Sequence, residues 1–194
     1  SFEKVGYNIS YKLVNAMDYN VPQERKRVIV VGYRKDLGKK FVFPEPSGKV
    51  ITLKQVIGSL PEPLAVGTNA SKTKADMLDI PNHEHMIGSF STIYMSRNRK
   101  KKWDESSFTI QAGARHAPLH PDANPMIKLG PDSWKFDEAS KEKYRRLSVR
   151  ECARIQTFPD SFVPPSKIKY VLELNAGRAQ FYKIKKDTLI DFIL

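Results

Sequence analysis

Three polar side chains alternate just before the most apolar run of the chain. Gln23, Arg25 and Arg27 precede the run Val-Ile-Val-Val at residues 28–31. Alternate residues of an extended segment point to the same side. A planar guanidinium there can hold a phosphate or a carbonyl oxygen through two parallel hydrogen bonds. These residues are therefore candidates for a binding site, and the alternative is a solvated basic edge.

A second set of cations lies in the middle of the chain, next to Trp103. Its members are Arg97, Arg99, Lys100, Lys101, Lys102 and, further along, Arg115. Lysines suit the phosphate backbone of DNA, whereas the arginine fork matches the O6 and N7 acceptors of guanine. Arg97, Arg99 and Arg115 are therefore candidate guanine contacts. A solvated charged face is the alternative reading.

The overall charge favours the binding interpretation. The 194 residues contain 33 Lys and Arg against 21 Asp and Glu, a net charge of 33 − 21 = +12. A charge of this size and sign predicts a polyanionic partner. With 40% hydrophobic residues the chain can build a core, which argues against a wholly disordered or fibrous protein. The longest apolar runs are far below the ~18 residues of a membrane-spanning helix, so we expect no membrane association.

Histidine and cysteine give no metal or nucleophile. The histidines are His83, His85, His116 and His120. Pro118 interrupts the last pair and no carboxylate pattern completes a site, so we expect surface or hydrogen-bonding histidines and no metal. Cys152, the single cysteine, falls on the apolar side of an expected helix, where its thiol is inert and packs in a core. One cysteine also fits a reducing compartment.

Two helices and three strands are predicted to position these residues. A helix from residue 53 to residue 60 follows a capping box at Thr52 and ends before Pro61. A second helix follows the capping box of Ser148 and Glu151 and stops before Pro159. Residues 28–31 read as a strand buried on both faces, and residues 90–95 and 108–111 as strands of a small lobe. We expect an irregular connection over 61–88 and a closing helix after residue 162.

Two stretches resemble motifs of the bacterial DNA (cytosine-5)-methyltransferases. Residues 15–32 resemble the Gln-x-Arg-x-Arg motif and the strand after it, and residues 146–160 resemble the ninth motif almost residue for residue. The polar residues of the ninth motif are Arg150, Glu151, Arg154 and Gln156, of which the first three are expected to form an ion-pair network that braces the recognition lobe. Between the motifs, residues 94–99 and 108–121 resemble HaeIII-type methyltransferases, which modify GGCC. In that relative the positions matching Arg97, Arg99 and Arg115 contact guanines.

The resemblance implies a fold and domain boundaries. The expected fold is α/β, comprising the C-terminal part of a Rossmann-like domain that uses S-adenosylmethionine, plus a small, mixed, mostly irregular or β target recognition lobe. Residues 1–45 would be the C-terminal strands of the catalytic domain. Residues 46–145 would form the target recognition domain, and residues 146–194 the ninth-motif helix and the return to the catalytic domain.

The resemblance also implies a reaction. In the family a cytosine is flipped out of double-stranded DNA and a cysteine attacks its ring. By analogy Arg27 would bind the O2 atom of the flipped base, with Arg25 and Gln23 organising the pocket. The cofactor loop and the Pro-Cys nucleophile of the family lie before the first motif seen here, and no Pro-Cys dipeptide is present. The final cofactor motif survives at most around Asn175 and Ala176.

We therefore expect a partial methyltransferase of a restriction-modification system in the bacterial cytoplasm, inactive by itself. A separate N-terminal catalytic subunit is one source of the missing half. The alternative is a DNA-binding module without catalysis, or a degenerate remnant of such an enzyme.

Overall fold

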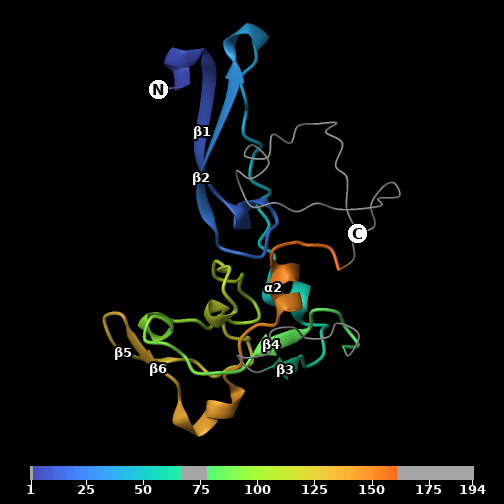
Figure 1. Cartoon of the computed structure of the whole chain (residues 1–194), viewed down its shortest axis with the longest axis vertical. Coiled ribbons are helices and arrows are strands. Elements are labelled where there is room, and N and C mark those ends of the chain that lie inside the picture. The colour runs from blue at the N-terminus through green and yellow to red at the C-terminus, as the bar shows by residue number, and fades with distance from the viewer. Residues whose placement is uncertain (1, 67–77, 161–194) are drawn as a thin grey trace, which may run out of the picture. The chain divides into compact units, whose positions relative to one another are not determined.

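The structure, a computed structural model, describes residues 2–66 and 78–160 (Figure 1). They form one compact unit by themselves. The expected tail helix after residue 162 and the cofactor positions Asn175 and Ala176 lie outside the described residues.

A long antiparallel hairpin occupies the N-terminal part. After the 3-10 helix η1 (Phe2–Val5), β1 (Tyr7–Asn15) pairs with β2 (Lys26–Arg34) in one unbroken register from Tyr7↔Arg34 to Asn15↔Lys26. The connection passes through η2 (Ala16–Tyr19) and reverses at Asn20, which takes the left-handed conformation at φ 64°. Asparagine tolerates this conformation better than most residues. The second strand is followed by η3 (Lys35–Leu37).

The expectation that residues 28–31 are buried on both faces is wrong for the described residues. Val28 is 66% exposed, Ile29 43% and Val30 53%. Within the described part of the chain β2 has one strand neighbour, β1. One face of the β1–β2 hairpin is covered by the segment after η3. There the hydroxyl of Ser10 donates a hydrogen bond to the carbonyl of Phe41. A strand is buried only where other parts of the chain pack on it. The segment after η3 packs on one face of the hairpin and leaves the other face exposed.

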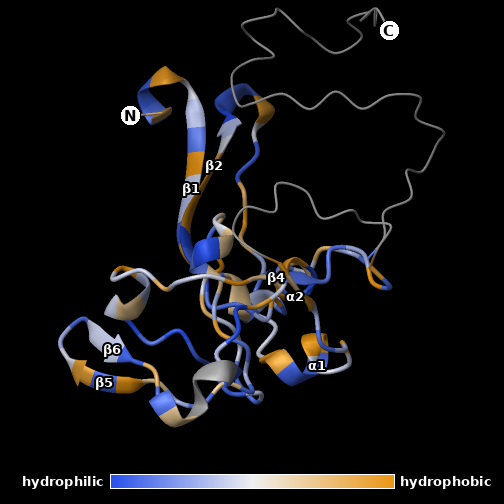
Figure 2. Cartoon of the chain, turned by 60° about the horizontal axis from the view of Figure 1, so that its bottom comes forward, coloured by the Kyte–Doolittle hydropathy of each residue, from blue (hydrophilic) through white to orange (hydrophobic). Residues whose placement is uncertain are grey.

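The rest of the unit is built from short elements. Helix α1 (Leu53–Ile57) follows the predicted capping box of Thr52 and Gln55 but ends earlier than expected, before Gly58. Strand β3 (Leu64–Val66) pairs in parallel with β4 (Glu84–Met86), and β5 (Ile127–Gly130) pairs antiparallel with β6 (Ser133–Lys135). The connection over 61–88 is therefore not entirely irregular. Figure 2, coloured by hydropathy, shows that these elements contain few long runs of hydrophobic residues.

Both strands expected in the recognition lobe are wrong. The segment 90–95 ends in the 3-10 helix η5 (Tyr94–Ser96), and Phe90 packs on Tyr94 with ring centroids 4.9 Å apart. The segment 108–111 forms no strand, and the residue before it, Ser107, makes an isolated bridge to Gln23. Two further 3-10 helices complete this region, η6 (Ala114–His116) and η7 (Glu138–Lys143).

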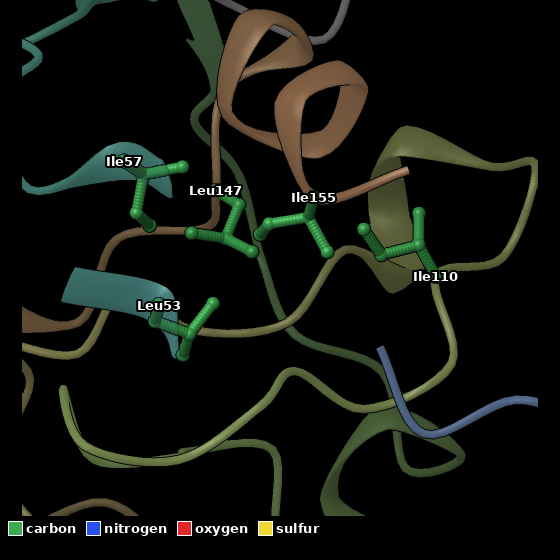
Figure 3. Close-up of a cluster of buried hydrophobic side chains, with 5 residues drawn as sticks. All are labelled: Leu53, Ile57, Ile110, Leu147 and Ile155. Carbon is green, nitrogen blue, oxygen red and sulfur yellow. The ribbon is translucent and has the colours of Figure 1, made fainter. Parts of the chain in front are cut away.

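Helix α2 (Val149–Ile155) confirms the second helix prediction in position, although it ends before residue 158. The Ser148 hydroxyl accepts from the Glu151 amide, and the Glu151 carboxylate accepts from the Ser148 amide. Its apolar face joins α1 in a core of buried side chains drawn in Figure 3, Leu53, Ile57, Ile110, Leu147 and Ile155. A second core surrounds Tyr94 and Leu119. The two helices thus hold the segment that contains Ile110.

Candidate functional site

One cavity lies between the start of β2 and residues of the segments 97–99 and 108–118. It has a volume of about 580 Å³. Its lining comprises Glu24, Lys26, Arg27, Arg97, Asn98, Arg99, Phe108, Thr109, Gln111 and Pro118. Arg27 and Arg97, far apart in sequence, therefore face the same cleft. Four of these side chains are cationic and one is a carboxylate, so the cleft favours an anionic ligand.

The Gln-x-Arg-x-Arg segment is clamped to residues 107–110. The amide of Glu24 donates to the carbonyl of Ser107 at 2.8 Å, and the hydroxyl of Thr109 donates to the carbonyl of Glu24 at 2.6 Å. Arg25 donates from Nη1 to the carbonyl of Ile110 at 3.4 Å. These bonds place the segment that leads into β2 against residues 107–110. Hence Arg25 organises the wall of the cleft rather than lining it.

The other two motif residues differ in exposure. Gln23 is fully buried, and its Nε2 has no hydrogen-bond partner within residues 2–66 and 78–160. Arg27 is exposed and lines the cleft, where its Nη1 donates to the neighbouring carbonyl of Lys26 at 2.7 Å. Arg27 is consequently the motif residue that is placed to touch a ligand.

Arg97 and Arg99 both line the cleft, but they differ in solvent exposure and in how many contacts hold the side chain. Arg97 is exposed. Arg99 is buried, donates from Nε to the carbonyl of Tyr94 at 3.0 Å, and has its guanidinium carbon 4.7 Å from the Tyr94 ring centroid. Burial lowers the pKa of Arg99 from its ordinary value. Between them, Asn98 accepts from the amide of Lys100 and donates to its carbonyl, which fixes the local bend.

The three lysines lie in an adjoining hollow. Its volume is about 190 Å³, and its lining includes Lys100, Lys101 and Lys102. Asn98 and Phe108 line both the hollow and the cleft, so the two are adjacent. Hydrogen bonds from the Lys102 amide and from Lys101 hold the pKa of Glu105 below its usual value. Lys102 itself is exposed.

Arg115 is the one predicted guanine contact that does not line the cleft. It is exposed on η6, and its carbonyl accepts a 3.2 Å hydrogen bond from Nε of Arg146. Arg145 and Arg146 both have central positions in the structure. The spacing of residues in the sequence predicted no role for either of them. The signal that could have drawn attention to them is the pair of arginines directly before a capping box.

Helix α2 takes part in an ionic network different from the expected one. Glu151 is 1% exposed and accepts from both terminal nitrogens of Arg145, at 2.9 and 3.0 Å. Burial alone would raise the pKa of Glu151, but Arg145 and the Ser148 amide hold it below the usual value. Arg150 and Arg154 both pair with Asp160. The expected grouping of these two arginines with Glu151 is therefore wrong, because Arg145 takes that place.

Gln156, His83 and His120 have structural partners, whereas the buried Nδ1 of His85 has no hydrogen-bond partner among the described residues. Gln156 donates from Nε2 to the carbonyl of Cys152 at 3.3 Å. His83 joins the Ser148 hydroxyl to the carbonyl of Pro61, at 2.9 and 2.8 Å. Burial lowers the pKa of His85 and of His120. Within the described residues no group of three or more His, Cys, Asp and Glu side chains could hold a metal ion.

Cys152 packs against the core of α1 and α2, as its position predicted. Burial, with a smaller contribution from Glu151, raises the pKa of its thiol to about 12. The thiolate, the reactive form, is therefore scarce at neutral pH. Cys152 is not suited to act as a nucleophile.

Comparison with known proteins identifies the class. Residues 1–179 match the C-5 cytosine-specific DNA methylases, and the chain belongs to this family. The type II methyltransferase M.MthTI of Methanothermobacter thermautotrophicus is 60% identical over 163 residues, covering 84% of this chain and 49% of the relative. M.FnuDI of Fusobacterium nucleatum is 48% identical over 164 residues, covering 83% of this chain and 48% of the relative. The chain thus spans about half the length of these two relatives.

The fold agrees with a solved structure of the same class. A protein assigned as a DNA modification methyltransferase, encoded within an E. coli prophage, matches 81% of this chain and 52% of its own, with a TM-score of 0.52 and 18% identity. The mixed α/β architecture with small sheets is therefore that of the C-terminal portion of a methyltransferase. No helix among the described residues is long and apolar enough to cross a membrane.

The family uses S-adenosylmethionine as methyl donor, and the cleft between β2 and residues 97–118 does not fit it. The reactive sulfonium of this cofactor is a cation. The cleft presents Lys26, Arg27, Arg97 and Arg99 against the single carboxylate of Glu24, so it repels such a group. Its charge suits DNA instead.

Proposed function

We propose that this chain is the DNA-recognition portion of a cytosine-5 methyltransferase of a restriction-modification system. Residues 1–45 belong to the catalytic domain, residues 46–145 recognise the target, and residues 146–194 return to the catalytic domain. The observation that supports this is the shared cleft, which combines Arg27 with Arg97 and Arg99 beside the lysine hollow. The cleft receives the flipped cytosine near Arg27, while Lys100, Lys101 and Lys102 contact phosphates.

The proposed target is GGCC, read by Arg97, Arg99 and Arg115. The support is the resemblance of residues 94–121 to HaeIII-type methyltransferases, together with the exposure of Arg97 and Arg115. Arginine is the usual reader of guanine because its fork spans O6 and N7. Arg99 lines the cleft and donates from Nε to the carbonyl of Tyr94 and from Nη2 to that of Ile93, so in this proposal its Nη1 contacts the guanine.

Arg97 and Lys102 provide a matched pair of variants for this proposal, because both are exposed and only Arg97 lines the cleft. Arg97→Ala is expected to cost about 1–3 kcal/mol on a GGCC duplex and little on a scrambled duplex. Lys102→Ala is expected to weaken binding to both duplexes equally and to lower the salt slope by about one. Affinities over a salt series measure both effects. Equal affinity of the unaltered chain for the two duplexes would refute GGCC recognition.

The catalytic cysteine and the cofactor site come, in this proposal, from the half of the enzyme that this chain does not span. One face of the hairpin supports this. Tyr11 lies opposite Val30 and Leu13 opposite Val28, and these four apolar side chains are all more than half exposed. A contiguous exposed apolar patch marks an interaction surface. The proposed occupant is the N-terminal catalytic half of a cytosine-5 methyltransferase.

Mixing tests this assignment. The segment of M.MthTI that precedes its match to this chain supplies a catalytic half, and transfer of labelled methyl groups to a GGCC duplex is measured for each piece and for the mixture. We expect transfer from the mixture alone. Leu13→Lys, on the exposed apolar face, should abolish it, whereas Lys12→Ala, on the opposite face, should not. Sequence-specific binding without transfer in the mixture would favour the alternative of a non-catalytic DNA-binding module.

A further inference from the structure

Arg146 is a buried cation held almost entirely by backbone carbonyls. It is 2% exposed. Its Nη1 lies 3.4 Å from the carbonyl oxygen of Met86 and 3.3 Å from that of Gly88, and its Nη2 lies 2.9 Å from that of Ser89. Its Nε donates to the carbonyl of Arg115 at 3.2 Å. Every nitrogen of the guanidinium is therefore used to join the end of β4 and the loop after it to η6.

Stacking extends this arrangement to Arg99. The guanidinium carbon of Arg146 is 3.8 Å from the Phe90 ring centroid and 5.3 Å from that of Tyr94. Arg99 lies 4.7 Å from the same Tyr94 ring. The Tyr94 hydroxyl in turn donates to the carbonyl of Ala117 at 3.0 Å. Tyr94 is thus in contact with both guanidinium groups, and Arg146 is linked through it to Arg99.

The backbone makes the same connection a second time. Leu119 bridges Lys100 on one side and Arg146 on the other. Its amide donates to the carbonyl of Arg99 at 2.9 Å, and the amide of Leu147 donates to the carbonyl of Pro118 at 2.8 Å. The segments that contain Arg99 and Arg146 are therefore tied to one intervening strand-like segment.

We propose that Arg146 is a positioning residue for guanine readout, which fixes the backbone of Arg115 directly and the guanidinium of Arg99 through Tyr94. This inference rests on the proposed function. Its physical basis is the shape of the guanidinium, which has a rigid fork for four carbonyl oxygens and a planar face for a ring. Lysine retains the charge but has neither feature. Since a DNA base contact requires a fixed donor geometry, loosening this residue should reduce sequence discrimination.

Arg145 provides the matched control. It is the adjacent arginine, its side chain is largely buried, and it pairs with Glu151 and Glu62. Its side chain has no hydrogen bond among the described residues to the 86–90 loop or to η6. A lysine at position 145 therefore weakens the fold near α2 without directly disturbing the proposed readers.

The test compares Arg146→Lys and Arg145→Lys in the full chain, at a temperature where both remain folded. For Arg146→Lys we expect the ratio of GGCC to scrambled-duplex affinity to fall by roughly 5- to 150-fold, the worth of one bidentate base contact. Affinity for the scrambled duplex should stay unchanged, because the phosphate contacts remain. Arg145→Lys should preserve the ratio. An equal fall for both variants, or none for Arg146→Lys, would overturn the proposal.

Hydrogen exchange separates this inference from the proposed target. Without DNA, Arg146→Lys should raise amide exchange in peptides covering residues 86–90 and 113–117, whereas Arg145→Lys should raise it in 149–155. Unchanged exchange in the first two peptides would refute the positioning role, whatever the DNA preference of the chain. If Arg146→Lys does not fold, Phe90→Leu removes the ring under the guanidinium, together with its contacts to Tyr94 and Phe136, but keeps the four carbonyl hydrogen bonds of Arg146, and it should raise exchange in the same two peptides.

Discussion

Arg27→Ala is expected to slow methyl transfer about 10²- to 10³-fold in the enzyme reconstituted with a catalytic half. In the proposed mechanism, attack on the cytosine ring places negative charge on the base, and the guanidinium of Arg27 at O2 stabilises that charge. The structure supports this role because Arg27 is the residue of its motif that lines the cleft. Duplex affinity should fall far less than the rate, since the lysine hollow and the guanine readers are unaffected.

Lys26→Ala is the control for Arg27→Ala. Lys26 is the neighbouring cation, is exposed, lines the same cleft, and lies 3.8 Å from the carboxylate of Glu24. Its loss should weaken binding of any duplex modestly and leave the single-turnover transfer rate of the bound complex near that of the unaltered enzyme. Single-turnover rates and affinities measured on the same duplex distinguish the two variants. Equal proportional losses of rate and affinity for Arg27→Ala would contradict its proposed role.

Local sequence signals predicted the helices well. The capping box of Ser148 and Glu151 depends on residues three apart, and the structure contains both of its hydrogen bonds. The core position of Cys152 followed from the same local periodicity. Strand burial failed because it depends on partners distant in sequence. The apolar run at residues 28–31 indicates the face of a sheet but does not say whether this chain covers it.

In the candidate site, too, features that depend on residue type were predictable, whereas features that depend on contacts between distant residues were not. Residue chemistry alone selected Arg27, Arg97, Arg99 and Arg115, and the fold brings the first three, but not Arg115, to one cleft. Residue type could not distinguish an exposed arginine such as Arg97 from a buried one such as Arg99. That difference arises from Tyr94, whose carbonyl and ring hold the Arg99 guanidinium. Arg146 escaped notice for a related reason, since its carbonyl acceptors have no sequence signature.

Glu151→Gln is expected to lower the free energy of unfolding by about 3–5 kcal/mol at pH 7, because it removes the buried counter-ion of Arg145 and leaves the exposed carboxylate of Glu62 as its remaining partner. Glu151 accepts two hydrogen bonds from Arg145 and one from the Ser148 amide. His120 lies 3.7 Å from the same carboxylate. The loss should therefore separate α2 from the recognition lobe and reduce DNA binding at temperatures where the unaltered chain remains folded. Denaturant unfolding at equilibrium measures the difference.

The pH dependence of that difference tests the ionic cause. The folded-state pKa of Glu151 is held below the value of 4.5 for a free glutamate, so its charge stabilises the fold above pH 4.5. This stabilisation is lost as pH falls through the folded-state pKa. The difference in the free energy of unfolding between the unaltered chain and Glu151→Gln should therefore decrease in that pH range. Glu105→Gln is the control, because this carboxylate pairs with Lys101 in a more exposed setting and should cost at most about 1 kcal/mol. A gap for Glu151→Gln that stayed constant from pH 7 to below pH 4 would show that packing, rather than the ion pair with Arg145, fixes α2 to the lobe.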